Sequence, residues 1–245
     1  MAQAPAADQA KLLAVQDLDT RIQQARHRLD TLPERAECAT LNAQIEQVGA
    51  ARIEAATAVS DARREVAKAE DDVQTVRARA QRDNARLLDA GMAPRELQGL
   101  QSELAVLAKR QSDLEDVELE AMQRLDDAEH ALATVTERAE ALQVQLGEAT
   151  ARLEHEEAAV NTELAMLASD REGAIDGIDA ALVALYEKLR LQYGGVGAAA
   201  LKHGTCEGCH MSLNPADVAA LQARPADDVV RCEECGRILV RGAAS

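Results

Sequence analysis

Four cysteines in the last forty residues have the spacing of a metal site. Cys206 and Cys209 form one C-x-x-C pair, Cys232 and Cys235 form a second, and 22 residues separate the pairs. Zn²⁺ prefers tetrahedral thiolate coordination, and two residues between paired cysteines let each pair form a tight turn around the metal. Gly208 and Gly236 are expected to supply the backbone freedom that such turns need. The sequence therefore predicts one structural zinc ion with these four cysteines as its ligands.

A site with four thiolates has no open position for an activated water, which favours a structural role over a catalytic one. The chain also has no glycine-rich phosphate loop and no nucleophile motif. We therefore expect a protein that is not an enzyme and has no small-molecule substrate. His203 and His210 lie beside the cysteines, and we expect them at the surface rather than among the ligands.

The residues around the cysteines form a short segment, 198–245, that follows the glycine-rich stretch "QYGGVGAAA". "AAALKHG" and "RILVRG" are predicted strands, and "NPADVAALQA" is a predicted helix capped by Asn214 with Pro215 in its first turn. About 48 residues with few large apolar side chains cannot easily sustain a core, so zinc binding is expected to stabilise the fold. We predict a zinc ribbon with a helical insert.

The rest of the chain has the composition of long helices. It contains no Phe or Trp and only two Tyr, while hydrophobic residues make up 47% and charged residues 29%. Such a mixture is typical of coiled coils. No apolar run is long enough to span a bilayer, and the N-terminus lacks a signal-peptide pattern. We expect a cytoplasmic protein with no membrane association, in a compartment where thiols stay reduced.

Two heptad ladders predict two long helices that form an antiparallel hairpin. Gly91 and Pro94 lie between the ladders, in a stretch where we expect a turn near 89–96. In an antiparallel hairpin, the residue numbers of facing positions add up to a constant, which describes the register. With a constant of 187, large side chains repeatedly oppose small ones, and this register is the first choice. A constant of 180 is the second choice. The ladders are Leu41, Ile45, Val48, Arg52, Ala55, Val59, Ala62, Val66, Ala69, Val73, Val76, Ala80, Asp83 and Leu87, then Leu97, Leu100, Leu104, Leu107, Gln111, Leu114, Glu118, Ala121, Leu125, Ala128, Leu132, Val135, Ala139, Leu142, Leu146, Ala149 and Leu153.

An N-terminal ladder from Val15 to Leu32 falls out of phase with the next one at Pro33, which predicts a kink near 33. Its apolar face is expected to meet residues of the returning chain between Val160 and Leu185. Residues 1–193 are thus predicted to form the coiled-coil hairpin. Cys38 falls on the ladder and is interpreted as a small apolar seam residue.

The order of a long helical hairpin, "YEKLR", a glycine break, "GTCEGCHMSLNP" and "VVRCEECGRILV" resembles the bacterial family of C4-type zinc-ribbon proteins with an N-terminal coiled-coil hairpin. The resemblance covers nearly the whole chain, although the discriminating residues lie between 186 and 240. It implies a mainly α fold with a small β zinc ribbon. It implies function less sharply, because the family is described as a predicted nucleic-acid-binding group while members are also linked to protein partners in transcription and in flagellar or secretion machinery.

The charge distribution suggests where a partner could bind. The net charge is −16, yet residues 77–110 carry +3 and residues 111–172 carry −13. One interpretation pairs arginines of the first helix with acids of the second. The other makes the basic end a docking site for an acidic partner or RNA, through Arg77, Arg79, Arg82, Arg86 and Arg95.

The ribbon segment has a net charge of −1 before thiolates and zinc are counted, and it lacks aromatic side chains for stacking on bases. A protein partner is therefore the first choice, and a DNA- or RNA-binding regulator is the alternative. We expect an adaptor or regulatory scaffold that is a monomer or a weak homo-oligomer.

Overall fold

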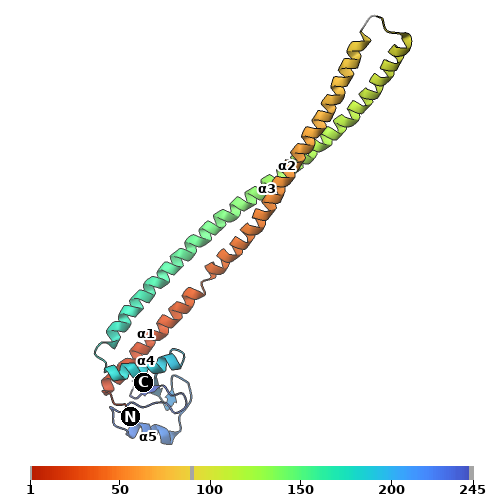
Figure 1. Cartoon of the computed structure of the whole chain (residues 1–245). Coiled ribbons are helices and arrows are strands. Elements are labelled where there is room, and N and C mark those ends of the chain that lie inside the picture. The colour runs from red at the N-terminus through yellow and green to blue at the C-terminus, as the bar shows by residue number, and fades with distance from the viewer. Residues whose placement is uncertain (1, 89–90, 243–245) are drawn as a thin grey trace. The chain divides into compact units, whose positions relative to one another are not determined.

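A computed structural model describes residues 2–88 and 91–242 of the chain (Figure 1). Helices account for most of these residues, and the short strands all follow residue 197. The helices are α1 (Ala6–Asp30), α2 (Pro33–Leu87), α3 (Pro94–Ile175), α4 (Ala180–Gln192) and α5 (Pro215–Ala223), and the strands are β1 (Ala198–Lys202), β2 (Thr205–Cys206) and β3 (Ile238–Val240). The predicted fold class, mainly α with a small C-terminal sheet, is confirmed.

The helix ends follow the local signals. Pro33 and Pro94 are the first residues of α2 and α3, where a missing N–H costs no hydrogen bond. The break between α1 and α2 confirms the kink predicted near 33. Gly91 has φ +138° between α2 and α3, as a reversal requires. Residues 89 and 90 of the predicted turn lie outside the described residues.

The chain divides into two compact units, which we describe separately. Residues 36–150 form the hairpin unit, and residues 1–35 together with 151–245 form the ribbon unit. We predicted a division into residues 1–193 and 198–245, which follows the secondary structure. In the division into compact units, α1, the end of α3 and α4 belong to the same unit as the ribbon. No helix among the described residues is long and apolar enough to cross a membrane.

In the hairpin unit, α2 and α3 wind around each other (Figure 1). Aliphatic side chains form the seam between them. One buried cluster contains Leu41, Val48, Ala139, Leu142 and Ala149. Cys38 packs against this cluster, and its Sγ lies 4.0 Å from Thr150 Oγ1. This position agrees with the prediction of a small seam residue.

Interhelical ion pairs define the register of the seam. The residue numbers of the Arg77–Glu115 pair sum to 192 and those of the Arg79–Glu103 pair sum to 182. One of these pairs lies on each side of the seam. The residue numbers of facing core residues should therefore add up to a value midway between these two sums. The midpoint is 187, in agreement with the predicted first-choice register rather than 180.

Asp83 is a charged residue inside this seam. It is only 7% exposed, and its Oδ2 has no hydrogen-bond partner among the described residues. The nearest cationic groups are Arg86 Nη1, 3.6 Å from Oδ1, and Arg79 Nε, 3.9 Å from Oδ2. A buried carboxylate oxygen without a hydrogen bond retains much of its desolvation cost.

We expect Asp83→Leu to stabilise the hairpin unit by about 1–3 kcal/mol, because it replaces this carboxylate with an apolar side chain. Urea unfolding followed by circular dichroism measures the effect. Asp71→Leu at an exposed position of α2 is the matched control and should change stability by less than about 0.5 kcal/mol. A loss of stability in Asp83→Leu would contradict the prediction.

In the ribbon unit, α1 packs against the end of α3 and against α4. Ile22, Ala25, Val160 and Leu167 form one buried cluster. A second cluster joins Leu12 and Val15 to Leu182, Tyr186 and Leu189, together with Ala198, Val229, Ile238 and Val240 of the ribbon. The predicted contact between the N-terminal ladder and the returning chain is therefore present. The ribbon shares its core with the helices.

The sheet has the order β2-β1-β3, with β1 antiparallel to β2 and parallel to β3. The N-terminal segment extends this structure, since Ala4 N donates to Asp227 O at 2.9 Å and Val229 N donates to Ala2 O at 3.0 Å. Asn214 caps α5 through its Oδ1, which accepts from Ala216 N. The predicted strands and the predicted capped helix are thereby confirmed.

Candidate metal centre

The four predicted ligands lie together. The Sγ atoms of Cys206, Cys209, Cys232 and Cys235 are all within 4.8 Å of one another. Cys206 Sγ lies 3.9 Å from Cys235 Sγ, and Cys209 Sγ lies 4.0 Å from Cys232 Sγ. A tetrahedron with Zn–S bonds of about 2.3 Å has edges of about 3.8 Å, whereas a disulfide bond is about 2.05 Å long. The cluster has the dimensions of a four-thiolate zinc site.

Each cysteine pair lies in a tight backbone turn. His210 N donates to Cys206 O at 2.7 Å, and Gly236 N donates to Cys232 O at 2.8 Å. His210 and Gly236 occupy the same place in the two turns, four residues after the first cysteine, and have φ +59° and +75°. Both turns therefore require a left-handed residue there. Gly236 has the role that we predicted for it.

Gly208 does not have the predicted role, because His210 occupies the left-handed position of its turn. Gly208 is needed there for a steric reason instead. A Cβ at Gly208 would lie 2.8 Å from Ala199 Cβ and 3.0 Å from Arg237 Cδ. The first turn therefore packs directly on β1, and only glycine leaves room for that contact.

Burial and local donors act differently on the thiols. Burial raises the pKa of Cys206 to about 12, against the opposing effect of the backbone N–H groups of Gly208 and Cys209. Burial also raises the pKa of Cys232. Burial acts in the same direction on Cys235, but hydrogen bonds from the backbone N–H and guanidinium of Arg237, together with those of Cys232 and Cys209, outweigh it and lower the pKa to about 7. Of the thiols of Cys206, Cys232 and Cys235, that of Cys235 most readily becomes a thiolate, and bound zinc would hold all four cysteines in that form.

Arg237 also links the second cysteine turn to the chain that follows α4. Its Nε donates to Val196 O at 3.0 Å and its Nη2 to Tyr193 O at 3.2 Å, while the guanidinium lies 5.6 Å from the centre of the Tyr193 ring. In the sequence analysis this residue counted only as one positive charge of the ribbon. Its role depends on carbonyls some forty residues earlier, which no local pattern indicates.

The other ribbon arginines are also bonded internally. Arg241 donates to Leu221 O, Pro225 O and Asp228 O at 2.8 Å each, near the C-terminal end of α5. Arg231 Nε donates to Gly236 O at 2.6 Å. Arg224 Nε lies 3.2 Å from Asp228 Oδ2. These guanidinium groups satisfy carbonyls and a carboxylate of the ribbon itself.

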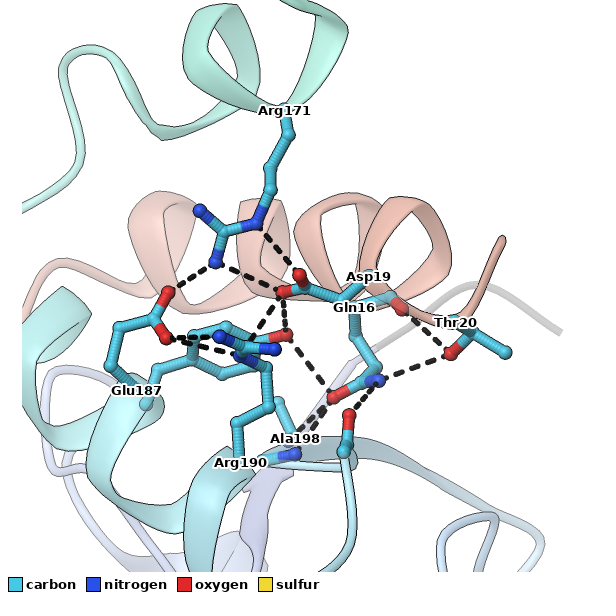
Figure 2. A network of polar contacts seen from close by, with 10 residues as sticks. Gln16, Asp19, Thr20, Arg171, Glu187, Arg190 and Ala198 are labelled. Carbon is cyan, nitrogen blue, oxygen red and sulfur yellow. Dashed lines mark hydrogen bonds and ion pairs between the residues drawn. The ribbon is translucent and has the colours of Figure 1, made fainter. Parts of the chain in front are cut away.

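A buried polar network connects α1, α3 and α4 with the start of β1 (Figure 2). Tyr186 Oη donates to Asp19 Oδ2 at 2.7 Å, and Arg171 Nε donates to Asp19 Oδ1 at 2.7 Å. Gln16 Oε1 accepts from Gly197 N at 2.8 Å. Burial raises the pKa of Tyr186, so its hydroxyl stays a neutral donor. The hydrogen bond to Asp19 raises the pKa of Arg171, which stays charged.

Sequence reasoning did not find this network. Gln16 and Asp19 are 8% and 5% exposed, although their positions on α1 look like ordinary polar positions of a solvated helix. The available signal was "YEKLR", which contains Tyr186, Glu187 and Arg190 in a chain with only two tyrosines. A buried tyrosine hydroxyl needs a hydrogen-bond partner, but the sequence does not say which one.

The predicted partner residues lie in the hairpin unit. Arg77 pairs with Glu115 at 2.6 Å, and Arg79 pairs with Glu103, as the interpretation of interhelical pairing expects. Arg82 Nε donates to Ala78 O of its own helix, and Arg95 is exposed. His203 and His210 are exposed and lie outside the four-thiol cluster, in agreement with their predicted surface positions.

The fold and the site define a class of protein in which a long antiparallel helical hairpin is followed by a small module with four cysteines around one metal position. The sequence profile of the CT398-like coiled coil hairpin domain matches residues 15–194, and that of the C4-type zinc ribbon domain matches residues 205–239. The chain belongs to the CT398-like coiled-coil hairpin family and carries a C4-type zinc ribbon. The resemblance found in the sequence is confirmed.

Known relatives match over nearly their whole length. The chain is 32% identical over 239 residues to the uncharacterized protein Rv2229c of Mycobacterium tuberculosis, covering 96% of each chain. A solved structure from Mycobacterium smegmatis is similar with a TM-score of 0.84 and 31% identity, covering 98% of this chain and 100% of the other. CT398 from Chlamydia trachomatis is similar with a TM-score of 0.67 and 20% identity over 96% of this chain and 98% of its own. At that identity the likeness concerns the fold alone.

Proposed function

We propose that this protein is a non-enzymatic adaptor or regulatory scaffold that binds a protein partner, with one zinc ion in a structural role. Four thiolates complete the coordination of zinc, so the ion holds the two cysteine turns together and leaves no position for a substrate or an activated water. The hairpin unit then supplies a long surface for a partner. The zinc site contributes to folding rather than to chemistry.

The hydrogen bonds and the ion pair of the ribbon arginines are the observation that favours a protein partner over nucleic acid. Nucleic acid binding depends on cations that can reach phosphate groups. Arg224, Arg231 and Arg241 instead bond to carbonyls and a carboxylate of the ribbon itself. Arg237 bonds to the carbonyls of Val196 and Tyr193, just before the ribbon. Lys202 is the remaining basic residue of this segment. The ribbon therefore offers little positive charge to phosphate, which favours a protein partner.

A nucleic-acid-binding regulator is the second candidate, supported by the net charge of +3 between residues 77 and 110. Phosphate contacts would make affinity fall steeply with ionic strength. Fluorescence anisotropy of the zinc-loaded full chain with labelled single-stranded RNA and duplex DNA, from about 50 to 200 mM salt, separates the two candidates. We expect no saturable binding at the lowest salt.

The proposal also predicts a stoichiometric protein partner in the native cell extract. Capture on the full chain, followed by reconstitution of the complex from two purified components, is the matching experiment. Saturable, salt-dependent binding of RNA or DNA without any reconstituted protein complex would replace the adaptor by the regulator.

A further inference from the structure

We infer that one side of the hairpin unit, near the α2–α3 turn, is a docking surface for an acidic amphipathic helix of a partner protein. This inference rests on the proposed adaptor function and specifies the chemistry of its partner. We call the surface the basic flank. Its residues are Arg79, Arg82 and Arg86 of α2 and Glu96, Gly99, Glu103, Val106 and Arg110 of α3.

Helical geometry places these residues in two stripes. Arg79, Arg82 and Arg86 are spaced i, i+3 and i+7, so they share one face of α2. Glu96, Gly99, Glu103, Val106 and Arg110 are spaced i, i+3, i+7, i+10 and i+14, so they share one face of α3. The Arg79–Glu103 ion pair bridges the two helices, which places both stripes on the same side of the hairpin unit.

The basic flank is open to solvent. The side chains of Arg79 and Arg86 are 58% and 68% exposed, and Val106 is 68% exposed. Arg82 and Arg110 are exposed and have no carboxylate within ion-pair distance among the described residues. A Cβ at Gly99 would meet no atom within 4 Å, so the space one heptad from Val106 is free for a partner side chain.

Asp83 helps to position these arginines. Its carboxylate is buried in the seam behind them and lies 3.6 Å from Arg86 Nη1 and 3.9 Å from Arg79 Nε. Asp83 therefore restrains the Arg79 and Arg86 side chains, which would otherwise rotate freely. A partner that binds them loses less free energy to the ordering of these side chains.

The opposite side of the same helices is different. Apart from the Arg77–Glu115 pair, its exposed positions carry uncharged side chains, and positive charge is thus sorted to one flank. Beyond residue 111, α3 becomes strongly acidic. An acidic partner would be repelled there and attracted to the basic flank. The uncharged positions are Gln74, Gln81, Asn84, Gln98, Gln101, Ala105, Ala108 and Ser112.

Charge complementarity and the exposed valine define the partner. Four arginines against two glutamates leave a net positive charge that attracts carboxylates. Val106 and the open space at Gly99 fit a large apolar side chain between these carboxylates. The part of the stripe from Gly99 to Arg110 covers 12 residues, and its ends are about 16 Å apart, which about three turns of a helix would span. The occupant is therefore a short helix with an acidic face and an aliphatic ridge.

The test uses the zinc-loaded full chain and a labelled synthetic helical peptide with glutamates on both edges of a leucine ridge. Fluorescence anisotropy should show saturable binding, at least about tenfold tighter than for a scrambled peptide of the same composition. Arg82→Glu with Arg110→Glu should weaken binding at least about tenfold, and so should Val106→Glu. Neither variant breaks an interhelical ion pair among the described residues.

Matched controls lie on the same two helices. Val144 is 62% exposed, and Arg52 of α2 and Arg138 of α3 are exposed and stand in no ion pair among the described residues. Val144→Glu, and Arg52→Glu with Arg138→Glu, should change the affinity by less than about twofold. Thermal unfolding of every variant reports whether its helices remain intact.

Four results would overturn the inference. Equal binding of the scrambled peptide would show that only charge is recognised. Binding of single-stranded RNA that the same variants abolish would assign the flank to nucleic acid. Concentration-dependent self-association in sedimentation, lost in the same variants, would make a second copy the occupant. If a reconstituted partner still binds the Arg82→Glu, Arg110→Glu variant at full affinity, the docking surface is wrong while the adaptor function stands.

If the native chain has no protein partner at all, the proposed adaptor function itself is wrong.

Discussion

Removal of zinc is expected to unfold the segment around the four cysteines while most of the helical signal remains. Structural zinc supplies roughly 10 kcal/mol or more of folding free energy in small modules of this kind. The buried cluster that the ribbon forms by itself is small and, besides Cys206 and Cys232, contains only Ala199, Leu221, Val230 and Leu239 among the described residues. Without the ion, the two cysteine turns have little else to hold them together. A chelator, or Cys206→Ser, should therefore expose residues 198–241.

Hydrogen exchange followed by mass spectrometry measures this loss, and circular dichroism at 222 nm reports the helices in the same samples. We expect protection to disappear in the ribbon and to persist in residues 36–150, because their seam contains no zinc ligand. Cys38→Ser is the matched control, since it removes the one cysteine outside the site. Unchanged protection of the ribbon after complete metal removal would show that its apolar core alone is sufficient.

Loss of Asp19 is the second change with a large expected effect. Asp19→Ala removes the acceptor that the Arg171 guanidinium and the buried Tyr186 hydroxyl share. Arg171 keeps its ion pair with Glu187, and Tyr186 Oη keeps Gln16 Oε1 at 3.2 Å. Losing a charged hydrogen-bond acceptor from a buried network costs about 1.5–3 kcal/mol. The ribbon unit should therefore unfold at a markedly lower urea concentration, as measured by the near-ultraviolet signal of its two tyrosines.

Two further variants make this test specific. Asp17→Ala removes an exposed carboxylate two residues away on α1, and it should cost less than about 0.5 kcal/mol. The double variant Asp19→Leu with Arg171→Met removes both charges, and it should recover a large part of the stability. Equal stability of Asp19→Ala and the native chain would mean that Glu187 and solvent compensate Arg171, and that the hydrogen bonds of Asp19 do not stabilise the ribbon unit.

Much of the architecture was predictable because it depends on local patterns. Heptad spacing predicted the two long helices and their seam, and the alternation of large and small residues favoured the register that the ion pairs support. Pro33, Gly91 and Pro94 marked the breaks through their own backbone preferences. The two C-x-x-C pairs predicted the four cysteines that the structure brings together, because the geometry of a cysteine turn is encoded within a few residues.

The tertiary structure decided features that depend on residues far apart in the chain. Asp19 and Gln16 become buried only because Arg171, Tyr186 and the start of β1 approach α1 from positions more than 150 residues later. Gly208 is constrained by β1 packing and not by its own backbone angle. The ribbon arginines bond to carbonyls that no spacing rule identifies. Heptads and cysteine turns repeat a local geometry that can be read along the chain, whereas the partners of a buried polar group are set by which surfaces meet when the chain folds.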